Sequence, residues 1–201
     1  MQYIYIILLL AVFLFIGVRI IFFLISPLIK RSSLVKVYNS FFFTREKKDF
    51  IEIHLGFARD LIFHNNFSRR KLLIHLVSGL LNLIKEIESG RIELNKTIRG
   101  NPYFFKVSNF RNFGFKERDL KCTEKIRFYL NYFELSFLKS FASKKLVFVK
   151  VDKLKIVYTN ARTLLENKNK ILSIYLRLTN FSMTDIDPSY QDSLSVSKTA
   201  V

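Results

Sequence analysis

Residues 68–89, SRRKLLIHLVSGLLNLIKEIES, carry the clearest internal signal for the fold of this chain. Apolar side chains recur every three or four positions and form a wide stripe on one side of a helix: Leu73, Leu76, Val77, Leu80, Leu81, Ile84 and Ile87. Ser68 suits the N-cap, and Gly90 can end the helix in the left-handed conformation. Gly79 costs about 1 kcal/mol in helix propensity but permits a neighbour to pack closely. We therefore predict an amphipathic helix over 68–89.

The segments around this helix combine helical and extended patterns. Upstream, a helix is predicted over 46–64, because five apolar side chains have helical spacing: Phe50, Ile53, Phe57, Leu61 and Ile62. The Phe-Phe-Phe triplet at 41–43 is either the first strand or turn of the core, or an exposed segment that enters a membrane interface. Downstream, 103–107 is predicted as a strand, 109–113 as a short helical turn, and the chain from Phe115 as another extended piece.

The C-terminal half shows the same mixture. A long helix is predicted over 123–142, with six large side chains on one side: Ile126, Leu130, Phe133, Phe137, Leu138 and Phe141. Residues 146–151 include β-branched side chains and are predicted to form a strand. Asp152 can cap a further helix that reaches Leu165. Alternating apolar and polar residues predict a strand over 172–178. Helices and strands that mix without regular alternation indicate an α+β domain and not a doubly wound sheet.

The N-terminal region has a different composition. Residues 3–29, YIYIILLLAVFLFIGVRIIFFLISPLI, hold a single charge, Arg19, in 27 residues. An apolar run longer than about 18 residues predicts a transmembrane helix, because a helix satisfies its own backbone polar groups inside hydrocarbon. A cleaved signal peptide would instead show a basic n-region and a small-residue cleavage site. Neither feature is found, so we expect residues 1–29 to be an uncleaved anchor.

The charges after this run predict its orientation and the organisation of the chain. Basic residues follow the run, which by the positive-inside rule places the C-terminal part in the cytoplasm and the protein in the cell membrane with a single pass. The residues expected at the membrane surface are Arg19, Lys30, Arg31, Lys36, Arg45, Lys47 and Lys48. We predict an anchor over 1–29, a basic juxtamembrane connector over 30–48, an α+β cytoplasmic domain over 49–182 and a disordered tail over 183–201.

The formal net charge of +17 has three interpretations. Anionic headgroups attract juxtamembrane Lys and Arg by about 1 kcal/mol each. A compositional bias toward Phe, Ile, Lys, Asn and Tyr raises the Lys count without any selection for phosphate contacts. Nucleic-acid binding requires a concentrated basic patch, whereas the basic residues here are spread evenly along the chain. The expected partners are therefore the lipid bilayer with its anionic headgroups and a protein, with nucleic acid the least favoured.

Few residues could carry catalysis. Asp60 and His64 are four apart and could share one helix face, although local helix pairing is the simpler interpretation. Cys122 would begin the helix at 123, where a helix N-terminus lowers the pKa of a thiol. These three residues are the catalytic candidates. The three histidines match no metal-ligand spacing and the six glycines are isolated, so we predict no metal site, no cofactor and no phosphate-binding loop.

One short segment resembles a known family. Residues 110–116, Phe-Arg-Asn-Phe-Gly-Phe-Lys, are similar to the Y-x-x-L-G-F-K ending of GNAT acetyltransferases, in which this turn precedes a late strand. The resemblance implies an acyltransferase. It covers seven of the 201 residues, and the Q/R-x-x-G-x-G/A loop that holds the coenzyme A pyrophosphate in that family is missing.

These observations predict a membrane-anchored cytoplasmic accessory or interaction module without a catalytic motif. The alternatives are a membrane-tethered, acyltransferase-like enzyme that uses Asp60 and His64, or Cys122, and a nucleic-acid-binding protein. A single cysteine rules out a disulfide framework within the chain.

Overall fold

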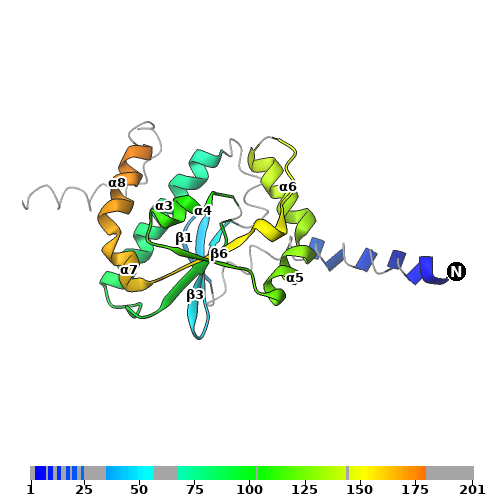
Figure 1. Ribbon diagram of the computed structural model, residues 1–201, viewed down its shortest axis with the longest axis horizontal. Coiled ribbons are helices and arrows are strands. Elements are labelled where there is room, and N and C mark those ends of the chain that lie inside the picture. Colours follow the sequence, from blue (N-terminus) through cyan, green and yellow to red (C-terminus); the bar gives the residue numbers. More distant parts are fainter. Residues whose placement is uncertain are drawn as a thin grey trace, which may run out of the picture.

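The computed structural model describes residues 3–7, 9–10, 13–14, 17–18, 20–21, 24, 35–56, 68–102, 104–143 and 145–179. Its core is a six-stranded mixed sheet with helices, which confirms the α+β class (Figure 1). The strands are β1 (Val35–Asn39), β2 (Phe42–Glu46), β3 (Phe50–Leu55), β4 (Thr97–Gly100), β5 (Lys116–Asp119) and β6 (Lys155–Asn160). The helices are α3 (Arg69–Glu88), α4 (Val107–Arg111), α5 (Cys122–Leu130), α6 (Tyr132–Ser143), α7 (Ala161–Glu166) and α8 (Lys168–Thr179), and a 3-10 turn, η1, covers Val151–Lys153.

The strands follow the order β1-β2-β3-β4-β6-β5 across the sheet. β1, β2 and β3 form an antiparallel meander, β3 and β4 are parallel, and β6 is antiparallel to both β4 and β5. Parallel neighbours need a long crossover connection, and α3 lies in the connection between β3 and β4. The amphipathic helix at the centre of the sequence is thus the element that joins the meander to the rest of the sheet.

Helix α3 forms as the sequence predicts. The Ser68 Oγ accepts a hydrogen bond from the Lys71 backbone N–H at 3.2 Å, and Gly90 follows the helix with φ of 73°. A Cβ at Gly79 would lie 2.1 Å from Cγ of Phe42, so the glycine permits helix and sheet to approach closely. The helix buries Leu72, Leu76, Val77, Leu80, Leu81, Leu83, Ile84 and Ile87.

The main core lies between one face of the sheet and the helices α3, α7 and α8, which Figure 1 shows at the left of the molecule. Ile51, Ile53 and Leu55 of β3 contribute to it together with Ile98 and Val157. A smaller cluster of Leu120, Val151 and Ile156 packs with Phe128 and Tyr132, near α5. In Figure 1, α5 and α6 lie on the other side of the sheet from α7 and α8.

The predicted transmembrane helix is contradicted. Within the described residues, no helix combines the length and the apolar character that a membrane crossing requires. The predictions of a single-pass protein and a signal anchor depended on that helix, so they are contradicted as well.

The predicted helix over 46–64 is wrong where the structure describes it. Phe50–Leu55 is strand β3, and residues 57–64 lie outside the described part of the chain. Its side chains alternate, since Ile51, Ile53 and Leu55 are buried while Phe50, Glu52 and His54 are half-buried. This period of two is the signature of a strand with one face on the core. The Phe41–43 triplet is buried in the core at the start of β2, so its interface alternative is also wrong.

Two further predictions, both in the C-terminal part of the chain, assigned a helix where a strand forms and a strand where a helix forms. The helix predicted from Asp152 to Leu165 is in fact η1, β6 and α7, with Asn160 as the N-cap of α7. Residues 156–159 are β-branched or aromatic and pair with neighbours on both sides, which favours a strand. The strand predicted over 172–178 lies within helix α8, because Ile171, Tyr175 and Thr179 recur every four residues and are buried.

The remaining differences occur in the irregular segments. Residues 104–107 turn into helix α4, where a strand over 103–107 was expected, and Tyr103 lies outside the described residues. The strand expected over 146–151 does not form, because two serines of α6 replace a neighbouring strand. Ser140 Oγ accepts from the Val147 N–H at 2.8 Å and Ser136 Oγ from the Val149 N–H at 3.1 Å. The helical character predicted over 123–142 is confirmed, but the single long helix is wrong, because the chain forms two helices, α5 and α6, that are separated at Asn131.

Candidate functional site

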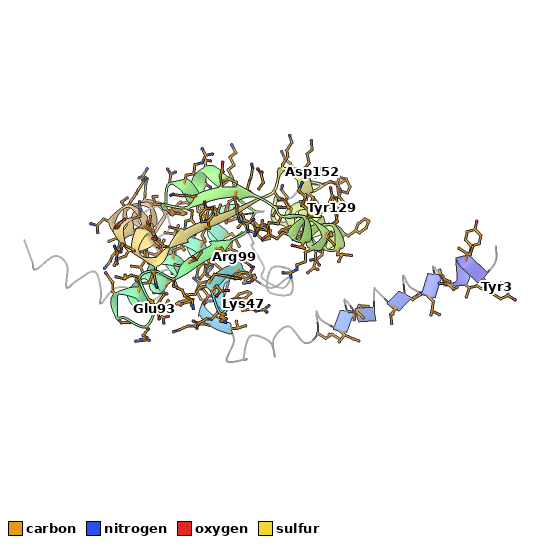
Figure 2. All side chains as sticks on the ribbon, turned by 60° about the horizontal axis from the view of Figure 1, so that its bottom comes forward. Tyr3, Lys47, Glu93, Arg99, Tyr129 and Asp152 are labelled. Atoms are coloured by element: carbon orange, nitrogen blue, oxygen red, sulfur yellow. The ribbon has the colours of Figure 1, made fainter. Side chains whose placement is uncertain are left out.

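The sheet face opposite α3 carries a row of polar residues, one from each of several neighbouring strands. Arg45 of β2 lies opposite Glu52 of β3, and Glu52 lies opposite Arg99 of β4. Arg99 in turn lies opposite Tyr158 of β6, and Tyr158 opposite Lys116 of β5. In Figure 2, Arg99 lies in the middle of the domain, away from its ends. The sheet therefore has an apolar face toward α3 and a polar face on the other side.

Helix α5 covers part of this polar face and leaves a pocket of about 150 Å³ beneath it. The sheet contributes Glu52 and His54 of β3, Arg99 and Gly100 of β4, the following Asn101, and Ile156 of β6 to the lining. The α5 side contributes Glu124, Arg127, Phe128 and the adjacent Asn131. Ionisable side chains from β3, β4 and α5 thus converge on one partly open pocket, which we call the polar pocket.

Glu124 is fixed at the start of α5. The Arg118 guanidinium donates to both of its carboxylate oxygens, at 2.7 and 2.8 Å, and the Lys121 backbone N–H donates at 2.8 Å. The hydrogen bonds from Arg118 hold the pKa of Glu124 at about 2, against the opposing effect of burial. Glu124 is therefore ionised at neutral pH, and both of its carboxylate oxygens already accept hydrogen bonds from Arg118.

Glu52 is a second ionised carboxylate, and it lies between His54 and Arg99. His54 Nε2 lies 3.5 Å from Oε2, and Arg99 Nη2 lies 3.5 Å from Oε1. The neighbouring His54, with help from Arg99, lowers the pKa of Glu52 although burial opposes the change. His54 is also stacked on Phe43, with ring centroids 4.9 Å apart and an interplanar angle of 9°. The Arg99 guanidinium lies 3.4 Å from the centroid of the Phe50 ring.

Four buried side-chain atoms around the polar pocket make no hydrogen bond with the described residues. They are Arg99 Nε, both Nδ2 and Oδ1 of Asn101, and His54 Nε2, whose 3.5 Å contact with Glu52 Oε2 is the long ion-pair contact described above. All three residues line the pocket. Buried polar atoms are nearly always paired in native proteins, so this concentration of unpaired atoms marks the pocket as a candidate binding site.

A second feature lies on the outer side of the same helix. Five large side chains of α5 and α6 are exposed, and we call them the α5–α6 seam: Ile126 at 54%, Tyr129 at 54%, Leu130 at 60%, Phe133 at 80% and Phe137 at 57%. Leu146 and Phe148, on the segment that follows α6, are exposed as well. Figure 2 shows Tyr129 and Asp152 side by side at this end of the molecule, where the Tyr129 hydroxyl donates to Asp152 Oδ1 at 3.2 Å.

Of the three catalytic candidates from the sequence, the structure describes Cys122. Cys122 is exposed at the first residue of α5 and does not line the polar pocket. Asp60 and His64 lie outside the described residues. Among the described residues, no group of three or more His, Cys, Asp or Glu side chains is placed to hold a metal ion.

The basic residues expected at a membrane surface have varied surroundings. Lys36 of β1 lies 2.6 Å from Glu86 Oε1, and Arg45 of β2 lies opposite Glu52 in the sheet. Lys47 and Lys48 occupy the turn between β2 and β3, where Figure 2 labels Lys47. Arg19, Lys30 and Arg31, as well as the predicted tail over 183–201, lie outside the described residues.

The sequence contained a signal for the polar pocket that the predictions missed. In FIEIHL, residues 50–55, Glu52 and His54 interrupt an apolar strand at every second position. Such alternation places both side chains on one face of a sheet. Because this segment was predicted to be a helix, Glu52 and His54 were not placed on the same face. That Arg99 and α5 also line the pocket follows from the strand order, which the sequence does not show.

We compared the chain with protein-family models, with curated proteins and with solved structures, and none of the three comparisons found a significant match.

Proposed function

We propose that this protein is an accessory interaction module that binds an amphipathic helix of a partner protein along the α5–α6 seam. The observation that carries the proposal is the exposure of five large apolar side chains in one stripe. Contiguous apolar surface on a protein marks an interaction site far more often than scattered single residues do. The proposal makes no use of a membrane span.

The spacing of the seam suits a helical partner. Ile126, Tyr129, Leu130, Phe133 and Phe137 follow one another at intervals of three, one, three and four residues. At about 1.5 Å per residue, residues 126–130 extend for roughly 6 Å along α5 and residues 133–137 for roughly 6 Å along α6, with Asn131 between the two helices. The stripe is narrow, like the seam along which two helices pack, and one apolar helix face would cover it.

The charges around the seam indicate the chemistry of the partner. Residues 121–153 contain eight Lys and Arg but only three Asp and Glu, an excess of five positive charges. One of the three carboxylates, Glu124, is already paired with Arg118. A partner helix with acidic residues beside its apolar face would complement this charge.

An anionic lipid surface would also attract these basic residues, but two features favour a protein helix. The exposed Glu134 follows Phe133 directly and would be repelled by acidic headgroups. The seam is also one helix face wide, whereas a helix that lies in a membrane interface presents a broad apolar face.

A site-specific crosslink tests the proposal. Benzoylphenylalanine replaces Phe133 in the full chain, which is expressed in its native cells and irradiated, and mass spectrometry identifies the crosslinked segment. We expect a protein segment with helical apolar spacing flanked by Asp or Glu. The same group at Ser173, exposed on α8, is the matched control and should give no such product.

Two variants examine the recognition itself. Ile126→Asp should abolish the crosslink at position 133, because it places a charge in the apolar seam. Lys125→Glu should weaken it, because it reverses a charge that the acidic partner needs. Crosslinks only to lipid, only to a second copy of this chain, or equally from positions 133 and 173 would overturn the proposal.

A further inference from the structure

The four unpaired atoms of the polar pocket constrain what could fill it. Asn101 offers the two N–H donors of its amide nitrogen and a carbonyl acceptor, and Arg99 Nε offers a donor. His54 Nε2 already lies 3.5 Å from Glu52 Oε2, so it places no further requirement on the ligand. A matching molecule therefore needs acceptor atoms for the Arg99 and Asn101 donors and also a donor of its own for the Asn101 oxygen.

The charge balance at the pocket selects an anion. Arg118 donates two hydrogen bonds to the Glu124 carboxylate. Arg99 and His54 each lie 3.5 Å from a carboxylate oxygen of Glu52. Arg127 also lines the pocket, and among the described residues its guanidinium forms no ion pair. Arg118, which does not line the pocket, is the partner of Glu124, and Arg99 is a partner of Glu52, so Arg127 is the lining guanidinium without a carboxylate partner among the described residues. A single negative charge would neutralise it.

The size of the pocket limits the molecule further. A volume of about 150 Å³ is below the roughly 300–1,000 Å³ typical of sites for drug-sized ligands. Phe128 and Ile156 add apolar surface to the lining, which suits a short hydrocarbon part. The pocket thus fits a molecule of a few non-hydrogen atoms with one charged end.

We propose that the polar pocket binds a small monocarboxylate with a hydroxyl group beside the carboxylate, such as a 2-hydroxy acid. The carboxylate accepts hydrogen bonds from Arg127 and Arg99 Nε, and the hydroxyl donates to Asn101 Oδ1. Charge-assisted hydrogen bonds from arginine supply most of the affinity, and the amide of Asn101 distinguishes a hydroxy acid from a plain carboxylic acid.

Calorimetric titration of the full chain with three probes tests this assignment. Glycolate should bind, and acetate should bind about 5- to 10-fold more weakly, which corresponds to the loss of one hydrogen bond. Inorganic phosphate, which is larger in charge and lacks a hydrocarbon part, should bind more weakly than glycolate. The assignment is overturned if glycolate gives no binding heat, if acetate binds equally well, or if phosphate binds best.

Two pocket variants and two controls locate the site. Arg127→Gln should weaken glycolate binding about tenfold or more, because a charge-assisted contact is lost. Asn101→Asp keeps the side-chain shape but places a carboxylate against the bound anion, and should abolish binding. Arg177→Gln, in a separate groove beside α8, should leave binding unchanged. Ile126→Asp alters only the seam, so retained glycolate binding in that variant separates this assignment from the proposed helix recognition.

Arg127 is exposed and its replacement should not disturb the fold, so that variant remains informative if Asn101→Asp unfolds. Thermal unfolding of each variant checks this point. Wild-type affinity in both Arg127→Gln and a folded Asn101→Asp, or an equal loss in Arg177→Gln, would show that the carboxylate does not occupy this pocket.

Discussion

Helix α3 and the pair α5–α6 have similar apolar spacing but opposite surroundings. On α3, Leu76, Leu80 and Ile84 are fully buried beneath the sheet. On α5 and α6, Ile126 and Phe133 are 54% and 80% exposed. Helical periodicity therefore shows that one side of a helix avoids water, but not whether the chain itself supplies the surface that covers it. For α3 the sheet is that surface, and for α5–α6 we propose a partner.

A matched pair of isoleucines gives the largest expected difference between the two regions. Ile84→Ala should lower the free energy of unfolding by about 2–5 kcal/mol, because it leaves a cavity in a closed core. Ile126→Ala should change it by no more than about 0.5 kcal/mol, because that side chain is exposed. Urea denaturation of both variants measures the difference. Equal losses would show that the α5–α6 seam is a structural core after all.

Close packing between α3 and the sheet gives the next largest effect. In an exposed helix, Gly→Ala would stabilise by about 1 kcal/mol through helix propensity. At Gly79 the new Cβ would lie 2.1 Å from Cγ of the fully buried Phe42, so the sign should reverse. We expect a loss of about 1–3 kcal/mol from overpacking. The adjacent Ser78→Ala is the control in thermal unfolding, and a stabilised Gly79→Ala would contradict the close contact.

The polar face should show a smaller effect that depends on pH. The pKa of Glu124 lies at about 2 in the folded protein and below its ordinary value of 4.5, so its ion pair contributes stability above about pH 4.5. That contribution is lost as the pH falls toward 2. Arg118→Gln should raise the pKa of Glu124 toward 4.5 and cost about 1 kcal/mol or less at neutral pH, because the pair is partly exposed.

Carboxyl chemical shifts in an NMR titration measure this pKa directly. Lys155→Gln removes the more exposed ion pair with Asp119 and serves as the comparison, with a smaller expected change in stability. An unchanged pKa of Glu124 in Arg118→Gln would show that Arg118 is not the group that holds this carboxylate in its ionised form.

The sequence predictions succeeded where the deciding residues are close together in the chain, and failed where they are far apart. Ser68, the apolar stripe and Gly90 lie within one helix, and that helix formed as predicted. The segments 50–55 and 155–160 failed because their apolar residues also match helical spacing over a longer window, and strand pairing decided the outcome. At 146–151 the strand was lost to Ser136 and Ser140, which lie earlier in the chain and were not recognisable as its partners. The candidate site was missed for the same reason, since its residues come from four separate segments.

The sequence by itself determined helix α3, its cap, its apolar face and the α+β character of the domain. Each of these depends on residues within a few positions of one another, where backbone geometry fixes which side chains share a face. Only the tertiary structure decided the polar pocket and the exposure of the α5–α6 seam. Both depend on which strands and helices are neighbours, and that order results from burying the α3 side of the sheet over the whole domain and not from any single segment.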